Sequence, residues 1–123
     1  MVSAHQEKYL WQIYKNVDED GSIRVSQLAN ALQVSRPSVS KIAKKLDEEG
    51  FVEFQRYGRI VLTEKGSEIG QSLSSNYEVL IRFFQLLDLE EEKMKEEVDK
   101  IQFYIGSETI DKLDSFLISL ERK

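Results

Sequence analysis

The segment SQLANALQVSRPSVSKIAKKLDEEGFV, from Ser26 to Val52, limits the fold more than any other part of the chain. Its first part has apolar residues at three- and four-residue spacing, which predicts a helix; they are Leu28, Ala29 and Leu32. Val34 then leads into a polar turn at Ser35, a good N-cap, and Pro37 lies just inside a second helix, where its missing N–H donor is not needed. Two short amphipathic helices joined in this way predict a helix-turn-helix.

The second predicted helix has one apolar and one basic face. Its inward stripe consists of Val39, Ile42, Ala43 and Leu46. Its outward face has no acidic residue before Asp47 and consists of Arg36, Ser38, Ser40, Lys41, Lys44 and Lys45. A helix that lies against the phosphates and base edges of DNA needs such a face. We therefore expect double-stranded DNA as the partner, with base-edge contacts from Arg36, Pro37, Ser38 and Ser40 and phosphate contacts from Lys41, Lys44 and Lys45.

The next segment favours DNA binding over an ordinary helical hairpin with a solvated basic face. Gly50 ends the helix, and FVEFQRYGRIVLT reads as two short alternating strands around a turn at Tyr57 and Gly58. Such a hairpin is the wing of a winged helix-turn-helix. Arg56, Tyr57 and Arg59 lie at its tip, where cations reach backbone phosphates or the minor groove, so we add these three residues to the expected DNA contacts.

The formal net charge of −5 is unusual for a DNA-binding protein until it is divided along the chain. Residues 1–62 hold nine Lys or Arg against eight Asp or Glu, which gives +1, whereas residues 63–123 hold eight against fourteen, which gives −6. We therefore expect DNA contacts in the first half only. Binding should weaken as salt rises, because it depends on a few concentrated cations.

The rest of the chain reads as helices. One helix precedes the motif and closes with DEDG at Gly21, and a long helix capped by Thr63 follows the wing. Two more follow, LEEEKMKEEVDKIQFYIG and SETIDKLDSFLISLE, the second capped by Ser107. The predicted inward positions are Tyr9, Leu10, Ile13, Tyr14 and Val17 on the first helix, Ile69, Leu73, Tyr77, Leu80, Ile81, Phe84 and Leu87 on the long helix, and Met94, Val98, Ile101 and Tyr104 on the next.

This pattern predicts a mainly α fold with a small β-hairpin. A winged helix-turn-helix DNA-binding domain would occupy residues 1–63 and a helical dimerisation domain residues 64–123. Three apolar-faced helices are more than a lone winged domain needs, and a two-fold dimer would double the DNA footprint. We therefore expect a homodimer on an operator.

Several stretches together resemble the manganese transport regulator branch of the DtxR family. They are EKYLWQIY, RVSQLANALQVSRPSVSKIAKKLDEEGFV, GRIVLTEKGSEIG, EEEKMKEEVDKIQFYI and SETIDKLDSFL, in that order. The helix-turn-helix and the VLTEKG junction carry the resemblance best. It implies a homodimeric bacterial transcriptional repressor, whose first three helices and wing bind an operator and whose later helices dimerise.

The resemblance also implies metal-gated DNA binding, but this chain departs from the ligand pattern. In that branch the ligands are an Asp and a Glu on the first helix, a His on the long helix, and a Glu-x-x-Glu-His group on the next. The matching positions here are Lys8, Trp11, Tyr77, Asp99, Gln102 and Phe103, of which Asp99 alone keeps a carboxylate. Because manganese and iron need several hard oxygen donors with an imidazole or two, we predict no metal site, no cofactor and metal-independent DNA binding.

The replacements suggest a site locked without metal. Lys8 would put an ammonium where the cation lies in the family, Asp99 could pair with it, and three aromatic residues would fill the cavity: Trp11, Tyr77 and Phe103. The alternative is that these aromatic residues are ordinary core and that Lys8 is exposed to solvent. Two other groups of possible ligands read as surface: the lone His5, and the acidic run of Glu90, Glu91, Glu92, Glu96 and Glu97.

No enzyme chemistry is expected. The chain has no cysteine, one histidine and no phosphate-binding glycine loop or Ser-His-acid set. No apolar run approaches the roughly 20 residues that span a bilayer, and the start lacks the apolar core of a signal peptide. We therefore expect a cytoplasmic protein with no membrane partner and no small-molecule substrate. Two alternatives stay open: a manganese- or iron-responsive repressor with a divergent site, and a dimerisation partner that modulates a metal-sensing relative.

Overall fold

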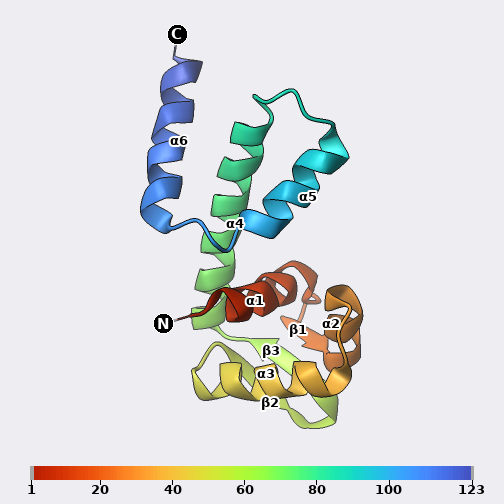
Figure 1. The fold of residues 1–123 in the computed structure, drawn as a ribbon. Coiled ribbons are helices and arrows are strands. Elements are labelled where there is room, and N and C mark those ends of the chain that lie inside the picture. Colours follow the sequence, from red (N-terminus) through yellow and green to blue (C-terminus); the bar gives the residue numbers. More distant parts are fainter. Residues whose placement is uncertain (1, 123) are drawn as a thin grey trace. The chain divides into compact units, whose positions relative to one another are not determined.

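The computed structural model describes residues 2–122, and the chain divides into two compact units that meet between Gln71 and Ser72 (Figure 1). The first unit holds α1 (Ala4–Asn16), β1 (Ser22–Arg24), α2 (Val25–Leu32), α3 (Arg36–Glu48), β2 (Val52–Gln55), the 3-10 turn η1 (Arg56–Gly58), β3 (Arg59–Leu62) and the start of α4 (Glu64–Phe84). The second unit holds the rest of α4, α5 (Glu91–Ile101) and α6 (Ser107–Glu121). The predicted mainly α class with a small β element is confirmed.

The predicted limit between residues 63 and 64 coincides with the start of α4, whereas the two units divide inside that helix. The domain limits therefore stay a prediction, and their outer ends, residues 1 and 123, lie outside the described residues. Within the described residues, no helix is both long enough and apolar enough to span a membrane.

The sheet of the first unit has three antiparallel strands in the order β1-β3-β2. The predicted hairpin of β2 and β3 therefore gains a strand, and Ile60 of β3 pairs with Ile23 on one side and Phe54 on the other. The prediction that the first helix closes at Gly21 was wrong, because α1 ends at Asn16. The DEDG segment is instead a turn that leads into β1, and the Asp20 carboxylate stabilises it by accepting the Ser22 N–H at 3.1 Å.

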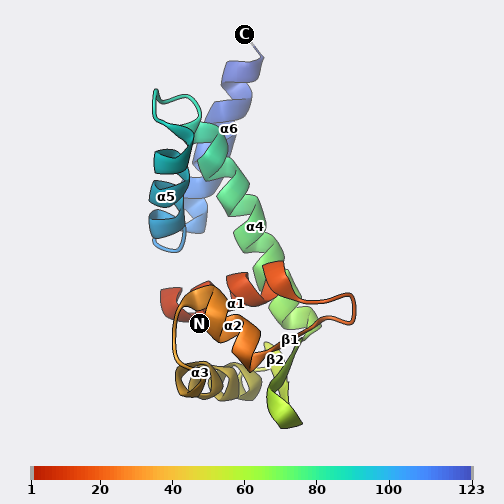
Figure 2. The same ribbon diagram turned by 90° about the vertical axis from the view of Figure 1, so that its right-hand side faces the viewer.

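The helix-turn-helix forms as predicted and is fixed at both ends of α3. The Ser35 hydroxyl accepts the N–H of Ser38 at 3.2 Å and caps the N-terminus. At the other end, Gly50 turns the chain with φ +85°, and the Asp47 carboxylate accepts the Phe54 N–H of β2 at 2.7 Å. Helix α3 therefore lies beside the β2–β3 hairpin in a set position (Figure 2).

A single apolar core holds the first unit together. Its members are Tyr9, Leu10, Ile13, Ile23, Val25, Leu28, Ala29, Val39, Ala43, Leu46, Phe51, Val52 and Ile60. Helix α4 packs on this unit through Gly66 and Gly70. A Cβ on Gly66 would strike the carbonyl oxygen of Phe51, and one on Gly70 would strike the ring of Tyr14. Glycine at these two positions is what lets the start of α4 approach so closely. Thr63 caps the helix as predicted, its hydroxyl accepting the Gly66 N–H at 3.1 Å.

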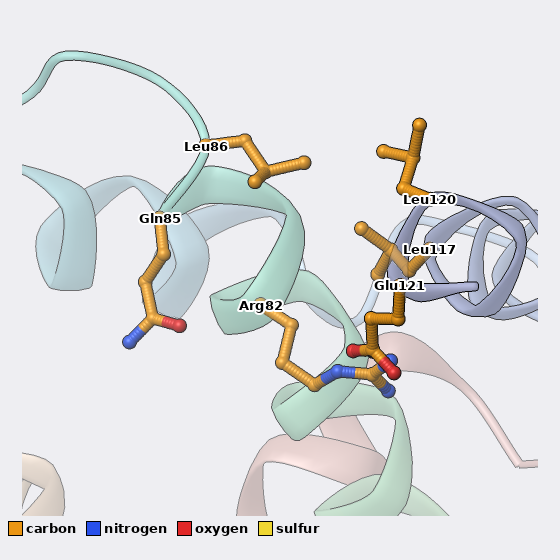
Figure 3. Close-up of a pocket in the computed structure, with 6 residues that line it drawn as sticks. All are labelled: Arg82, Gln85, Leu86, Leu117, Leu120 and Glu121. Carbon is orange, nitrogen blue, oxygen red and sulfur yellow. The ribbon is translucent and has the colours of Figure 1, made fainter. Parts of the chain in front are cut away.

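The second unit has its own core, formed by Val79, Leu80, Val98, Ile110 and Leu117. Arg82 of α4 is joined to α6 by ion pairs with Asp114 at 2.9 Å and Glu121 at 3.4 Å. Figure 3 shows this arginine reaching toward Glu121 beside a hollow of about 340 Å³, which is also lined by Gln85, Leu86, Leu117 and Leu120. Because both ion pairs are partly exposed, they add little to the stability of this unit.

Three details predicted for the second unit were wrong. Leu87 lies beyond the end of α4 and is 44% exposed, and Tyr104 lies beyond the end of α5 and is 67% exposed. The N–H groups of both residues bond to the carbonyl three positions earlier, which closes each helix in a tight turn. Gly106, and not Ser107, is the N-cap of α6, and Ser107 is the first residue of that helix.

Candidate nucleic-acid interface

The seven residues of α3 that we predicted to contact DNA all lie away from the core. Six are exposed and one, Ser40, is half-buried; the exposed six are Arg36, Pro37, Ser38, Lys41, Lys44 and Lys45. The opposite stripe is buried at Val39, Ala43 and Leu46 and half-buried at Ile42. The apolar stripe anchors the helix, so the cationic face is presented to solvent on a fixed element.

The tip of the wing presents Arg56 and Tyr57. Tyr57 is 90% exposed and has left-handed backbone geometry, φ 62°, and Gly58 follows with φ 72°. Two successive residues of this kind reverse a hairpin tightly. A Cβ on Gly58 would lie 3.4 Å from Cγ2 of Val25, so the turn passes close to the start of α2. The left-handed Tyr57 makes the tip a strained turn.

Arg59, the third predicted wing residue, is tied into the sheet. Its guanidinium donates to the Asp20 carboxylate at 3.0 Å, to the Gln55 amide oxygen at 2.8 Å and to the Ser22 hydroxyl at 3.3 Å. The Ser22 hydroxyl, and then Arg59, hold the pKa of Asp20 below its ordinary value. Arg59 therefore links segments around all three strands, and its contact with DNA stays a prediction.

Two open hollows flank the N-terminal end of α3. The notch between α3 and the wing has a volume of about 360 Å³ and is lined by Arg24, Val25, Ser26, Arg36, Ser40, Phe54, Tyr57 and Gly58. The second hollow, between α2 and α3, has a volume of about 500 Å³ and includes Asn30, Gln33 and Ser35. Arg36 lines both hollows. Of the predicted DNA contacts, Arg36 and Ser40 of α3 and Tyr57 of the wing thus line one notch together.

Sequence reasoning missed one residue of this notch, Arg24. It is the last residue of β1, is also the N-cap of α2, and is exposed. Its guanidinium Nη1 donates to the carbonyl oxygen of Tyr57 at 3.2 Å. In the sequence, Arg24 is a lone arginine directly before the first helix of the motif. Its position beside the wing could not be inferred, because it depends on β1, a strand too short to predict.

These features define a winged helix-turn-helix protein with a helical second unit. Residues 1–60 match the iron dependent repressor N-terminal DNA binding domain, and residues 63–123 match the iron dependent repressor metal binding and dimerisation domain. The chain therefore belongs to the DtxR family of iron-dependent repressors, whose members are transcriptional regulators rather than enzymes. It is 35% identical over 113 residues to the HTH-type transcriptional regulator MntR of Bacillus subtilis (strain 168), which covers 92% of this chain and 80% of that protein. MntR of Bacillus velezensis is similar to the same extent.

Solved structures show the same fold. The manganese regulator SloR superposes with a TM-score of 0.76 at 29% identity over 92% of this chain, and the metal-dependent transcriptional regulator MtsR with a TM-score of 0.76 at 25% identity. This chain spans about half of each of those two chains, 53%. The hypothetical protein SSo2273 of Sulfolobus solfataricus has a TM-score of 0.74 over 89% of its own length, and at 22% identity it shows the fold alone.

Two of the six positions expected to correspond to metal ligands lie on α1, in the first unit. Lys8 is half-buried, and Trp11 is 6% exposed. The Trp11 ring stacks on Tyr14, with ring centroids 6.3 Å apart, and the Lys15 ammonium lies 5.0 Å from its centre. An ammonium and an indole supply no metal-ligating oxygen or imidazole at these positions.

The other four positions lie in the second unit. Tyr77 and Phe103 are half-buried, Asp99 is exposed and Gln102 is 5% exposed. Burial, and then the nearby Asp99 carboxylate, raise the pKa of the Tyr77 phenol, which therefore stays protonated at neutral pH. The Gln102 oxygen Oε1 is buried and has no hydrogen-bond partner among the described residues.

This donor set does not fit manganese or iron. Among residues 2–122, no group of three or more His, Cys, Asp or Glu side chains is placed to hold a metal ion. One exposed carboxylate and one amide oxygen provide fewer hard donors and less negative charge than such an ion requires. The single feature that favours a ligand is the unpartnered Gln102 oxygen, because a buried acceptor without a donor is costly.

Proposed function

We propose that this chain is a sequence-specific transcriptional repressor that binds operator DNA as a homodimer, without a metal ion. The observation that carries the DNA-binding part is the exposed cationic face of α3 beside the wing. The helix is anchored by a buried stripe and fixed at both ends, as a recognition helix must be to read base edges in the major groove. Operator binding would place the protein with the DNA, in the cytoplasm.

Within this proposal, the contacts divide by position along the interface. The residues at the start of α3 would contact base edges: Arg36, Pro37, Ser38 and Ser40. The later cations of α3 and the wing would contact the DNA backbone: Lys41, Lys44, Lys45, Arg56, Tyr57 and Arg59. The first group lies at the helix N-terminus, the part of a recognition helix that contacts base edges in helix-turn-helix complexes.

The dimer part is supported by exposed apolar side chains. Seven of the nine large hydrophobic residues that are exposed among residues 2–122 belong to the second unit: Leu86, Leu87, Leu89, Tyr104, Phe116, Ile118 and Leu120. So many large exposed apolar side chains within one unit favour an interaction surface. The match of residues 63–123 to a metal binding and dimerisation domain supports the same use.

Metal independence is supported by the chemistry of the six replaced positions. Asp99 is the single carboxylate among them, and an ammonium, an indole, a phenol and a phenyl ring stand at four of the others. The second candidate function is metal-responsive repression through a divergent site, which the buried, unpartnered Gln102 oxygen favours. Calorimetric titration of Mn²⁺ into the purified protein separates the two, because a saturable heat would support the second candidate and its absence the first.

The test of DNA binding uses fluorescence anisotropy with a labelled duplex from the region upstream of the protein's own gene. A scrambled duplex of the same length and composition is the control. The proposal predicts tighter binding to the upstream duplex and weaker binding to both as salt rises. Equal affinity for the two duplexes over the whole salt series would contradict a sequence-specific role.

A further inference from the structure

Arg24 lies at a rigid junction of the first unit. Its backbone pairs with Arg59 at the end of β1, and its N–H donates to the Gln27 side chain at 2.9 Å at the start of α2. Both the strand and the helix therefore fix the point from which its side chain leaves the backbone. A side chain that starts from such a point can hold a neighbouring turn in place.

The loop it holds is the strained tip of the wing. Tyr57 has left-handed backbone geometry, which costs a non-glycine residue energy unless the surroundings maintain it. The Arg24 guanidinium maintains it from one side, with Nη1 3.2 Å from the Tyr57 carbonyl oxygen. Val25 lies beside the turn, with its Cγ2 3.4 Å from where a Cβ on Gly58 would be. The backbone position of Tyr57 thus depends on Arg24.

Arg24 also lines the notch between α3 and the wing. Among the described residues, the guanidinium makes the single hydrogen bond to Tyr57, so its other N–H groups have no partner in this part of the chain. The notch, about 360 Å³, is also lined by Arg36 and by the polar residues Ser26 and Ser40. A concave surface with the Arg24 guanidinium and the Ser26 hydroxyl suits a singly charged phosphodiester, and it leaves Arg36 and Ser40 for the base edges.

We propose that the notch between α3 and the wing binds one backbone phosphate of operator DNA, and that Arg24 is its main ligand while positioning the wing through Tyr57. This rests on the proposed function. It adds a binding site and a residue that the basic pattern of α3 did not indicate. The phosphate contact would fix how deeply α3 enters the groove, and the Tyr57 contact would set where the wing meets the backbone.

The test compares Arg24→Met, which keeps the aliphatic stem, and Arg24→Lys, which keeps the charge, with Arg122→Met as a matched control in the second unit. Upstream and scrambled duplexes are titrated over a salt series. Arg24→Met should weaken binding to both about tenfold. Because the proposed dimer presents two notches, it should also reduce the slope of log affinity against log salt by about 1.8, or about 0.9 for each phosphate. Arg24→Lys should keep the slope but bind more weakly than wild type, because an ammonium does not reproduce the planar fork.

A second measurement uses the wild-type protein, so it does not depend on the variants folding. The NMR resonance of the Arg24 Nε–H group should shift when either duplex is added. Inorganic phosphate at matched ionic strength should leave it unchanged, and an equal shift with phosphate would mean a general anion site and overturn the DNA assignment. An unchanged salt slope in Arg24→Met, with no resonance shift, would also overturn the proposal. If wild type itself does not prefer the upstream duplex, the proposed function fails instead.

Discussion

Arg36 and Lys44 are both exposed cations of α3, but they lie at different points of the interface. Arg36 is the first residue of the helix and lines both hollows beside it. Lys44 lies about two turns later on the exposed face. Recognition helices contact base edges mainly through their N-terminal residues. We therefore expect Arg36 to contact a base edge and Lys44 to contact a phosphate.

We predict that Arg36→Ala weakens binding to the upstream duplex by about 1–3 kcal/mol more than binding to a scrambled duplex, because base-edge contacts carry sequence preference. Lys44→Ala should weaken both equally, because a phosphate contact is independent of sequence. Anisotropy titrations at one salt concentration measure both effects. Equal losses on the two duplexes for Arg36→Ala would show that Arg36 does not read bases.

Gly66 and Gly70 carry no charge, yet they set the packing of α4 against the first unit. We predict that Gly66→Ala lowers the free energy of unfolding by about 1–3 kcal/mol, because its Cβ would strike the rigid Phe51 carbonyl rather than a flexible side chain. Gln71→Ala, at an exposed position of the same helix, is the control and should change stability by less than about 0.5 kcal/mol. Urea denaturation compares them, and equal effects would refute the packing argument.

The wing is the element whose construction the sequence pattern left incomplete. Its two four-residue strands and its turn were predictable from alternation and from Tyr57-Gly58, but β1 has three residues and no alternation that could be recognised. Its partner on β3 could not be inferred either, because pairing depends on contacts distant in sequence. The polar cluster of Asp20, Ser22 and Arg59 followed from β1 and was missed for the same reason.

This cluster gives the wing a measurable acid dependence. The Ser22 hydroxyl, at 2.7 Å, and then Arg59 lower the pKa of Asp20 from its ordinary 3.8. A carboxyl with a lowered folded-state pKa stabilises the fold above its unfolded pKa, and this stabilisation disappears as pH falls through the folded value. By NMR, the pKa of the Asp20 carboxyl should be higher in both Ser22→Ala and Arg59→Met than in wild type. An unchanged titration in Ser22→Ala would contradict the role of the Ser22 hydroxyl.

Helix ends show a second limit of prediction at the scale of elements. Ser35 and Thr63 were correctly expected to cap α3 and α4, because hydroxyl side chains before an apolar stripe give a strong local signal. The ends of α4 and α5 were predicted too late. Leu87 and Tyr104 continue the apolar spacing, but the backbone closes before each of them, and apolar spacing alone does not reveal this.

At the scale of the whole molecule, the proposed function assigns DNA binding to the first unit and dimerisation to the second. The first unit presents the cationic face, and the second carries most of the exposed apolar residues. The family and the helix-turn-helix were recognisable from sequence because both depend on local motifs. The side-chain contacts made by the residues at the six replaced metal positions could not be predicted from sequence, because these contacts depend on side-chain packing.

Phe116, 51% exposed on α6, tests the proposed dimer. We predict that Phe116→Lys raises the dimer dissociation constant at least about tenfold, because it replaces buried apolar surface by a charge. Thr109→Lys, on an exposed residue of the same helix, is the matched control and should remain dimeric. Sedimentation equilibrium measures both. A monomeric wild type would rule out the dimer, and a dimeric Phe116→Lys would place its interface elsewhere.

The most direct test of the central claim is the affinity of the wild-type protein for its upstream duplex, at fixed salt, first after treatment with chelator and then with added Mn²⁺. The replaced ligands predict tight, sequence-preferring binding with chelator present and no gain on adding manganese. Binding that appears only with manganese would contradict metal independence. In that case the Gln102 oxygen and the Asp99 carboxylate would be the first candidate ligands of a divergent metal site.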